Sequence, residues 1–295
     1  MSMQIRHLPA LLALLLPATS LMALQEMIPL KIAPTGHATV TVHIDALGQH
    51  DFVFDTGAEG TAVYRKFADE LGLRESGEKE TLIGQSGETD LSLAPLPPLS
   101  LGSIKADSIA AVILPDRADG VALVGVIGLD VFGNYLLDFD LPRMRVAFYN
   151  SGVLPPEIDK LDPLHAKITT GNLLMIDVRL DDVEAVAVLD TGARKTRINW
   201  LLGKKLGLDP GTLERGDVIQ GATNTPLDTG ISVVDSVTLG GQQLVNAPVL
   251  VADLPVFAAF GVDQQPAVIL GLDWLLSTRM LIDFPERKVW FLSAR

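Results

Sequence analysis

The sequence repeats one short segment at a separation of 135 positions. The first copy reads Phe-Val-Phe-Asp-Thr-Gly-Ala at 52–58, and the second reads Ala-Val-Leu-Asp-Thr-Gly-Ala at 187–193. In both copies an apolar run leads directly into an ionisable carboxyl group, Asp55 or Asp190. Such a group at the end of a buried strand costs free energy, so its repetition indicates a use for it. The copies predict two similar halves whose aspartates face each other.

Further features follow both copies in the same order. They are a threonine, a Leu-Gly-Leu tripeptide, a segment ending in Gly-Leu-Asp, and a closing aliphatic-Asp-Phe segment. The first half carries them at Thr61, 71–73, 126–130 and 137–139, and the second half at Thr196, 206–208, 269–273 and 282–284. The separation grows from 135 to 145 by the last pair, so the second half has about ten more residues in its middle. Duplication of one unit is the simplest explanation.

Between the repeats, residues 151–163 contain Gly152, Pro155, Pro156 and Pro163, which predicts a linker. We therefore expect an N-terminal lobe at 24–150 and a C-terminal lobe at 164–295.

Within each half the pattern favours strands. Residues 39–44 and 175–180 alternate between polar and apolar side chains, and short turns follow both. Hairpins with glycine-rich tips are expected at 81–90 and 217–227. One helix is expected after each triplet, over Ala62–Leu71 and Ile198–Leu206, ended by Gly72 and Gly207. Many short strands with little helix indicate β-barrels or sandwiches.

The residue types of the triplet suit one chemistry. The aspartate supplies a carboxylate, the threonine can hydrogen-bond across a twofold axis, and the glycine lets the backbone come close enough to donate amide hydrogens. Two carboxyls brought within about 3 Å resist double ionisation and share one proton. One can then accept a proton from water while the other donates to a carbonyl under attack.

These motifs resemble the retropepsin-type aspartyl proteases. The resemblance covers about residues 31–292 and includes the later Ile-Gly-Leu-Asp and Leu-Gly-Leu-Asp segments, which are similar to that family's second signature. It implies an all-β fold of two pseudo-twofold-related barrel lobes, with one or two short helices each. Two lobes in one chain resemble bacterial periplasmic aspartyl proteases and, in architecture, the pepsins. The implied activity is that of an aspartic endopeptidase with no cofactor beyond water.

The resemblance also assigns roles to residues. Asp55 and Asp190 would be the catalytic pair, supported by their own triplet loops, while Asp130 and Asp273 would be structural. A third Asp-Thr-Gly at 228–230 lacks the flanking features and is interpreted as a turn. Ordinary hairpins would explain the two glycine-rich tips nearly as well as substrate-binding flaps do. The supporting loop residues are Thr56, Gly57, Thr191 and Gly192, and the flap residues are Gly84, Gln85, Ser86, Gly87, Gly221 and Ala222.

Two departures from the pepsins matter. Alanine follows both triplets, as in retropepsins, where pepsins have a hydroxyl residue. One hydrogen bond fewer to the ionised form leaves the pair less acidic, so we expect activity at mildly acidic to near-neutral pH. Neither presumed flap contains a tyrosine, so a pepsin-like flap contact is not expected.

The first 23 residues have the layout of a secretory signal peptide, with Arg6, an apolar run at 8–16 and small residues before position 24. We expect a periplasmic or secreted protein without stable membrane insertion after cleavage. The net charge of −13 disfavours nucleic acid and anionic lipid as partners. Cysteine is absent and the five histidines are scattered, so no metal site is expected.

A peptide or protein substrate and a monomer that pairs its own two lobes are the remaining expectations. Three alternatives stay open: a protease-shaped protein that binds peptides without cutting them, lobes that pair between chains, and turn aspartates that only bind backbone amides.

Overall fold

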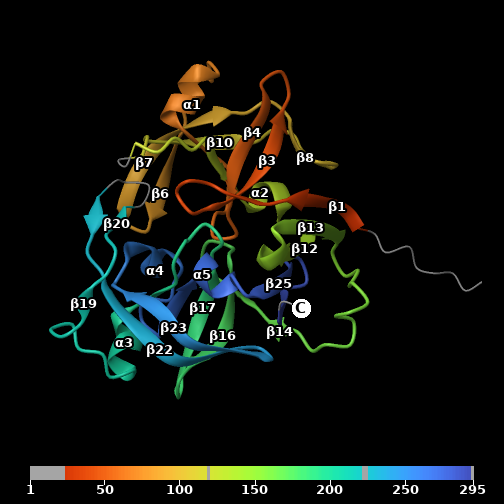
Figure 1. Cartoon of the computed structure of the whole chain (residues 1–295). Helices are drawn as coiled ribbons and strands as arrows, with labels where there is room; N and C mark the ends of the chain where they lie inside the picture. Colours follow the sequence, from red (N-terminus) through yellow and green to blue (C-terminus); the bar gives the residue numbers. More distant parts are fainter. Residues whose placement is uncertain (1–23, 118–119, 221–224, 294–295) are drawn as a thin grey trace, which may run out of the picture.

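The computed structural model describes residues 24–117, 120–220 and 225–293, so the signal peptide expected at 1–23 lies outside it. Figure 1 shows one lobe of mostly N-terminal strands above one of mostly C-terminal strands, with further strands between them. The chain is mostly β-structure, as the sequence predicts.

The N-terminal lobe is built on a ten-stranded sheet in the order β6-β7-β10-β5-β11-β4-β3-β8-β9, with β2 paired to β3. Two of its pairings are parallel, β4 with β11 and β5 with β10. The strands are β2 (Lys31–Ile32), β3 (Ala38–Ile44), β4 (Gly48–Phe54), β5 (Ala62–Tyr64), β6 (Lys79–Gly84), β7 (Gly87–Pro95), β8 (Leu99–Leu101), β9 (Ile104–Ala106), β10 (Ala110–Leu114) and β11 (Gly125–Ile127).

The C-terminal lobe repeats this plan in an eight-stranded sheet, β15-β16-β17-β24-β18-β23-β22-β19, with β20 and β21 as a separate hairpin. Its parallel pairs, β17 with β24 and β18 with β23, correspond to those of the first lobe. The strands are β15 (Lys167–Ile168), β16 (Leu174–Leu180), β17 (Val183–Leu189), β18 (Arg197–Ile198), β19 (Glu214–Arg215), β20 (Ile219–Gln220), β21 (Pro226–Leu227), β22 (Gly230–Leu239), β23 (Gln242–Val251) and β24 (Ala267–Leu270).

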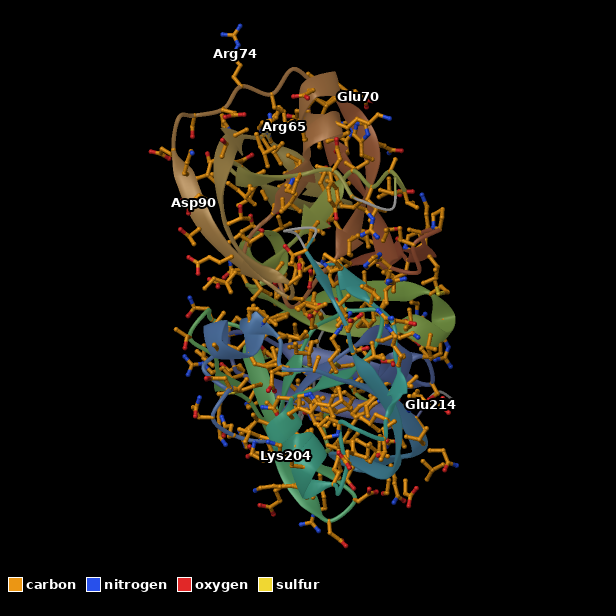
Figure 2. The ribbon with its side chains drawn as sticks, turned by 90° about the vertical axis from the view of Figure 1, so that its left-hand side faces the viewer. Arg65, Glu70, Arg74, Asp90, Lys204 and Glu214 are labelled. Carbon is orange, nitrogen blue, oxygen red and sulfur yellow. The ribbon has the colours of Figure 1, made fainter. Side chains whose placement is uncertain are left out.

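The alternating sequences become strands with one face in the core. In β16 the residues Leu174, Ile176, Val178 and Leu180 are buried while Asp177 and Arg179 between them are exposed. This period of two is what a half-buried strand requires. Asp177 and Arg179 accordingly face outward, and Figure 2 shows Arg74 and Asp90 projecting from the upper lobe in the same way.

A six-stranded sheet, β1-β13-β12-β25-β26-β14, joins the two halves. Strand β12 of the first half pairs antiparallel with β25 of the second, with Leu137 opposite Ile282. The two closing aliphatic-Asp-Phe segments therefore lie side by side at the centre of the molecule. The strands are β1 (Leu24–Pro29), β12 (Tyr135–Asp140), β13 (Arg145–Asn150), β14 (Leu164–His165), β25 (Thr278–Asp283) and β26 (Lys288–Ser293).

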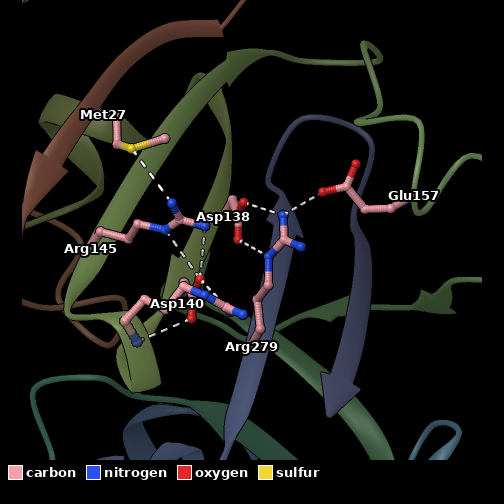
Figure 3. A network of polar contacts seen from close by, with 7 residues as sticks. Met27, Asp138, Asp140, Arg145, Glu157 and Arg279 are labelled. Atoms are coloured by element: carbon pink, nitrogen blue, oxygen red, sulfur yellow. Dashed lines mark hydrogen bonds and ion pairs between the residues drawn. The ribbon is translucent and has the colours of Figure 1, made fainter. Parts of the chain in front are cut away.

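Buried carboxylates on this sheet are paired with arginines (Figure 3). Arg279 of β25 donates two hydrogen bonds to Asp138 of β12, at 2.6 and 2.5 Å, and one of 3.0 Å to Glu157. Asp140, fully buried, accepts from Arg143 and Arg145. Arg279 thus connects the second half both to the first half and to the segment between them.

That segment, residues 151–163, is described throughout and contains neither helix nor strand. It is nevertheless packed. Ile158 is fully buried, and Ser151 Oγ and the Gly152 amide donate to the Asp283 carboxylate at 2.6 and 2.7 Å.

The helices differ from the sequence prediction in two respects. Those after the triplets begin later than expected, because Ala62–Tyr64 and Arg197–Ile198 pair as strands β5 and β18 first. The described part of the second lobe has three helices where one or two were expected, since α4 lies in its longer middle section. No helix in the described ranges is long and apolar enough to cross a bilayer. The helices are α1 (Arg65–Glu70), α2 (Leu129–Phe132), η1 (Leu141–Arg143, 3₁₀), α3 (Trp200–Lys205), α4 (Pro255–Ala259) and α5 (Leu272–Leu275).

Candidate active site

The two Asp-Thr-Gly loops begin where the central strands β4 and β17 leave their sheets. The Asp55 amide donates to Ile127 O at 3.2 Å, and the Asp190 amide donates to Leu270 O at 3.1 Å. Each acceptor is the last residue of the neighbouring parallel strand, β11 or β24. The same final pairing in each lobe therefore sets the place where its aspartate emerges.

The threonines interlock the two loops across the interface between the lobes. The Thr56 amide donates to Thr191 Oγ1 at 3.0 Å, and the Thr191 amide donates to Thr56 Oγ1 at 3.1 Å. Each hydroxyl also donates to a carbonyl of the opposite lobe, Thr56 to Leu189 O at 2.9 Å and Thr191 to Phe54 O at 2.7 Å. These four bonds obey a local pseudo-twofold axis, and both threonines are buried.

The glycines let the loops approach closely. A β-carbon added to Gly57 would lie 2.6 Å from Asp190 Cγ, and one added to Gly192 would lie 2.1 Å from Asp55 Oδ2. No real side chain tolerates such contacts, so only glycine allows each loop to lie against the other loop's carboxyl. The structure therefore brings Asp55 and Asp190 together, as the resemblance implies for a catalytic pair.

Backbone amides hold both carboxyls in place. Asp55 Oδ1 accepts from the Gly57 amide at 2.7 Å, and Asp190 Oδ1 accepts from the Ala193 amide at 2.8 Å. Asp190 is only 6% exposed, whereas Asp55 is partly exposed. Asp55 is therefore the member of the pair that solvent or a ligand can reach more easily.

Burial raises the pKa of both carboxyls. Desolvation is the main cause for Asp55, and the charge of Asp190 raises its pKa further, to well above the ordinary value. Desolvation also raises the pKa of Asp190, but the positive charge of Arg197 opposes that rise. At intermediate pH such a pair carries one proton and one negative charge, which belong to the two groups jointly.

The second signature of each lobe, at 126–130 or 269–273, packs against the triplet loop of the same lobe. A β-carbon on Gly128 would lie 2.7 Å from the carbonyl oxygens of both Ala58 and Gly60, and one on Gly271 would lie 2.8 Å from Ala193 O. These glycines permit the start of α2 and of α5 to pack directly on the loop backbone. The Leu129 amide donates to Ala58 O at 3.0 Å as part of the same contact.

The aspartates of that signature bind the threonines that follow the triplets. Asp130 accepts from the Thr61 amide and hydroxyl, both at 2.9 Å. Asp273 accepts from the Thr196 amide and hydroxyl at 2.8 and 2.7 Å. Both carboxylates are engaged within their own lobe, which is the structural role expected for them.

The first glycine-rich hairpin joins the two lobes. Strands β6 and β7 pair up to Gly84 and Gly87, with Gln85 and Ser86 between them, and Ser86 is buried. Both strands contact α4 of the other lobe. The hairpin expected here is therefore present and reaches across the lobe interface, while its role as a flap stays a prediction.

The second expected hairpin is formed by β20 and β21, with Ile219 opposite Leu227. Its tip residues Gly221 and Ala222 lie outside the described residues. The third Asp-Thr-Gly follows β21, where Asp228 is exposed and pairs with Arg215. Asp228 and Thr229 connect β21 to β22, and Gly230 begins β22, so this triplet does not follow a central strand as the other two do.

Sequence reasoning missed three charged residues around the dyad. Arg194 Nη1 donates to Thr35 O of the opposite lobe at 3.0 Å, and Glu59, at the equivalent position in the first lobe, lies against Gly171 of the second. Arg197 is buried beside Asp190. The signal that could have identified Arg197 is its break with the repeat, since the first lobe has Ala62 at that position.

Within the described ranges, no three His, Asp or Glu side chains are arranged to hold a metal ion. The arrangement can instead bind a water molecule against two carboxyls that share a proton, which is sufficient for acid–base hydrolysis.

Comparison with models of protein families matches the chain to one described as aspartyl protease, over residues 40–131 and 176–274. The two matched segments contain the two triplets and end in the two second signatures. A comparison with curated proteins found no match.

Proposed function

The chain belongs to the aspartyl protease family, and from this premise we propose that it is an aspartic endopeptidase whose water is activated by Asp55 and Asp190. The observation that carries the proposal is the interlocked pair of loops, in which Thr56 and Thr191 exchange hydrogen bonds and hold the two carboxyls together. Both carboxyls are present and both are desolvated.

The reaction needs one proton and one negative charge on the dyad. The ionised carboxyl takes a proton from water, the water oxygen attacks the peptide carbonyl, and the protonated carboxyl donates to the carbonyl oxygen. The product of this step is a neutral tetrahedral gem-diol, and the dyad still carries one proton. Collapse of the gem-diol releases the amine, so no covalent bond forms between enzyme and substrate.

An extended peptide is the substrate class that fits two lobes facing each other across paired loops. The hairpin of β6 and β7, which contacts α4 of the other lobe, is placed to cover such a peptide and exclude water from it. We propose Gly84, Gln85, Ser86 and Gly87 as its substrate-facing tip, together with Gly221 and Ala222 of the second hairpin. Sequence features of residues 1–23 support export to the periplasm or beyond.

Digestion of a peptide library tests the proposal directly. The wild-type chain should cleave, and Asp55→Asn should lose cleavage because the dyad can no longer hold both a proton and a charge. Asp228→Asn is a matched control, since it removes a carboxyl from an exposed Asp-Thr-Gly outside the dyad. Cleavage that survives in Asp55→Asn would remove Asp55 from the mechanism. Binding of peptides without cleavage by the wild type would favour the non-catalytic alternative.

A further inference from the structure

Arg197 is a charged residue at a position where the repeat predicts an apolar one. It follows Thr196 in the second lobe, as Ala62 follows Thr61 in the first. Its side chain is only 8% exposed, although burying a guanidinium costs free energy unless the charge is compensated. A buried cation that only one of two matched lobes contains makes the site electrostatically asymmetric.

The strand register places Arg197 on the face from which Asp190 emerges. Val188 of β17 is opposite Ile269 of β24, and Ile269 is opposite Arg197 of β18. These three side chains form one row on one face of the sheet. Asp190 is two residues beyond Val188 and therefore continues on that face.

The arginine side chain extends along the sheet towards the level of the dyad. Its Nη1 donates to Lys195 O at 3.1 Å, two residues before it and ahead of β18. That carbonyl oxygen lies beside Gly271, which follows β24, because a β-carbon on Gly271 would be 2.9 Å from it. Its buried Nε has no hydrogen-bond partner, and no carboxylate in the described part of the chain forms an ion pair with it. The guanidinium charge is therefore not neutralised by a carboxylate of its own.

The charged groups with the largest effect on Arg197 come from the surrounding elements. They are Asp190, Arg194, Asp273 and Asp217. Asp273 is bound to Thr196, and Asp217 is paired with Lys195 at 2.7 Å, so each has another partner. Arg194 repels the guanidinium. Asp190 is the acidic group of this set that belongs to the dyad.

We propose that Arg197 is a positioning residue that breaks the symmetry of the dyad by holding the negative charge on Asp190, so that Asp55 carries the shared proton. Asp190 is then the base that takes a proton from water, and Asp55 is the acid that donates to the substrate carbonyl. The assignment of chemical roles rests on the proposed function, but the place of the proton does not. Asp190 is less exposed than Asp55, so exposure alone would predict that Asp190 keeps the proton. The charge of Arg197 reverses that prediction.

The directions of the pKa shifts agree with this geometry. The charge of Arg197 opposes the rise of the Asp190 pKa, whereas the charge of Asp190 adds to the rise of the Asp55 pKa. Burial lowers the pKa of Arg197, and Asp190 opposes that fall, so arginine and aspartate stabilise each other's charged forms.

Carbon-13 NMR of chains labelled at the aspartate side-chain carboxyl tests the proposal without any substrate. Asp55→Asn and Asp190→Asn assign the two resonances. As the pH rises through the first ionisation step of the wild-type pair, the carbon-13 chemical shift of the Asp190 carboxyl should change more than that of the Asp55 carboxyl. In Arg197→Met, which keeps the bulk and removes the charge, the Asp190 share of the change should fall and the step should move up by about one pH unit or more. Arg197→Lys should restore the wild-type order.

Arg179→Met is the matched control, because it removes an exposed arginine of the same lobe that pairs with Glu184. It should leave the order of ionisation unchanged. An Arg197→Met chain that is folded and still ionises Asp190 first, as the wild type does, would overturn the proposal. If Arg197→Met fails to fold, the wild-type spectrum still decides, because ionisation of Asp55 first would equally overturn it.

Enzyme kinetics distinguishes the positioning role of Arg197 from the proposed endopeptidase activity. The acid limb of kcat/KM against pH should move up by about one unit in Arg197→Met. A rise in KM confined to peptides with acidic side chains, with an unchanged pH profile, would make Arg197 a substrate contact instead and contradict the proposal. If the wild type cleaves no peptide while Asp190 still ionises first, the proposed function fails and the inference about Arg197 stands.

Discussion

At the scale of single residues, the dyad is positioned by uncharged groups. The hydroxyls of Thr56 and Thr191 and the hydrogen atoms of Gly57 and Gly192 determine how close the two loops come. The carboxyls are then desolvated by the packing that these residues permit. The triplet therefore repeats as a unit because each of its members is needed to bring the charge to the interface.

The raised pKa of Asp55 predicts how stability depends on pH. The folded chain keeps a proton that the unfolded chain releases once the pH passes about 4. The stabilisation is therefore complete below that pH and is lost as the pH rises through the folded-state pKa. From about pH 4 up to the raised folded-state pKa, the free energy of unfolding of the wild type should fall relative to Asp55→Asn, by up to about 1.4 kcal/mol per pH unit. Urea unfolding at each pH measures this difference, and a difference that grows with pH would contradict the shift.

The raised pKa of Asp55 also predicts how activity depends on pH. Because burial and the second carboxyl raise the pKa of Asp55, and because alanine follows each triplet, the shared proton should persist into the mildly acidic to near-neutral range. A pH–rate profile that peaks below about 3 would contradict this expectation.

At the scale of elements, each lobe supports its aspartate through the same junction of strand, loop and short helix. A glycine that packs on the loop directly follows strand β11 or β24, and the aspartate two residues later binds the threonine beyond the triplet. All contacts of the junction lie within one lobe. Each junction therefore positions the aspartate of its own lobe.

Gly128→Ala tests the junction. The added β-carbon would lie 2.7 Å from Ala58 O and must push the loop that carries Asp55. We expect a loss of kcat/KM of about tenfold or more, on the order of what a misplacement near 1 Å costs. Gly241→Ala is the control, because nothing lies within 4 Å of a β-carbon there. Equal activity of the two variants would show that the junction does not position the carboxyl.

The sequence predicts the strands of each lobe better than it predicts the helices. The alternation of residues 39–44 and 175–180 identifies strands because it depends only on neighbours along the chain. The helices after the triplets begin later than expected because pairing of β5 and β18 with distant strands overrides local helix preference. Helix α4 lies in the apolar stretch 254–260 of the longer second half, where the short run gives no clear period. The sequence identifies site residues by their recurrence in both halves. Arg197 does not recur, because the first half has Ala62 at the equivalent position.

At the scale of the whole molecule, one central sheet makes the two lobes a single unit. Three strands of the first half join three strands of the second half in it through the pairing of β12 with β25, and the paired loops of the dyad also join the two halves. The halves identified from the repeat are therefore lobes that share structure and not separable domains. This arrangement supports the proposal that one chain provides both halves of its own pair.

Arg279→Met tests the coupling between the lobes. It leaves the buried Asp138 carboxylate without its partner, and breaking a buried pair in this way costs about 3 to 5 kcal/mol. We expect a loss of that order in the free energy of unfolding by urea. The double variant Arg279→Met with Asp138→Leu should recover much of the loss, because no buried charge remains. A single variant as stable as the wild type would show that this pair does not hold the lobes together.

The central claim is that Asp55 and Asp190 act as one unit, and a double-mutant cycle tests it most directly. The kcat/KM for one peptide is measured for the wild type, Asp55→Asn, Asp190→Asn and the double variant. Groups that act jointly lose nearly everything when either is removed, so each single variant should fall about as far as the double variant, by about a thousandfold or more. A single variant that keeps a tenth of the activity, or two losses that multiply in the double variant, would contradict the shared dyad.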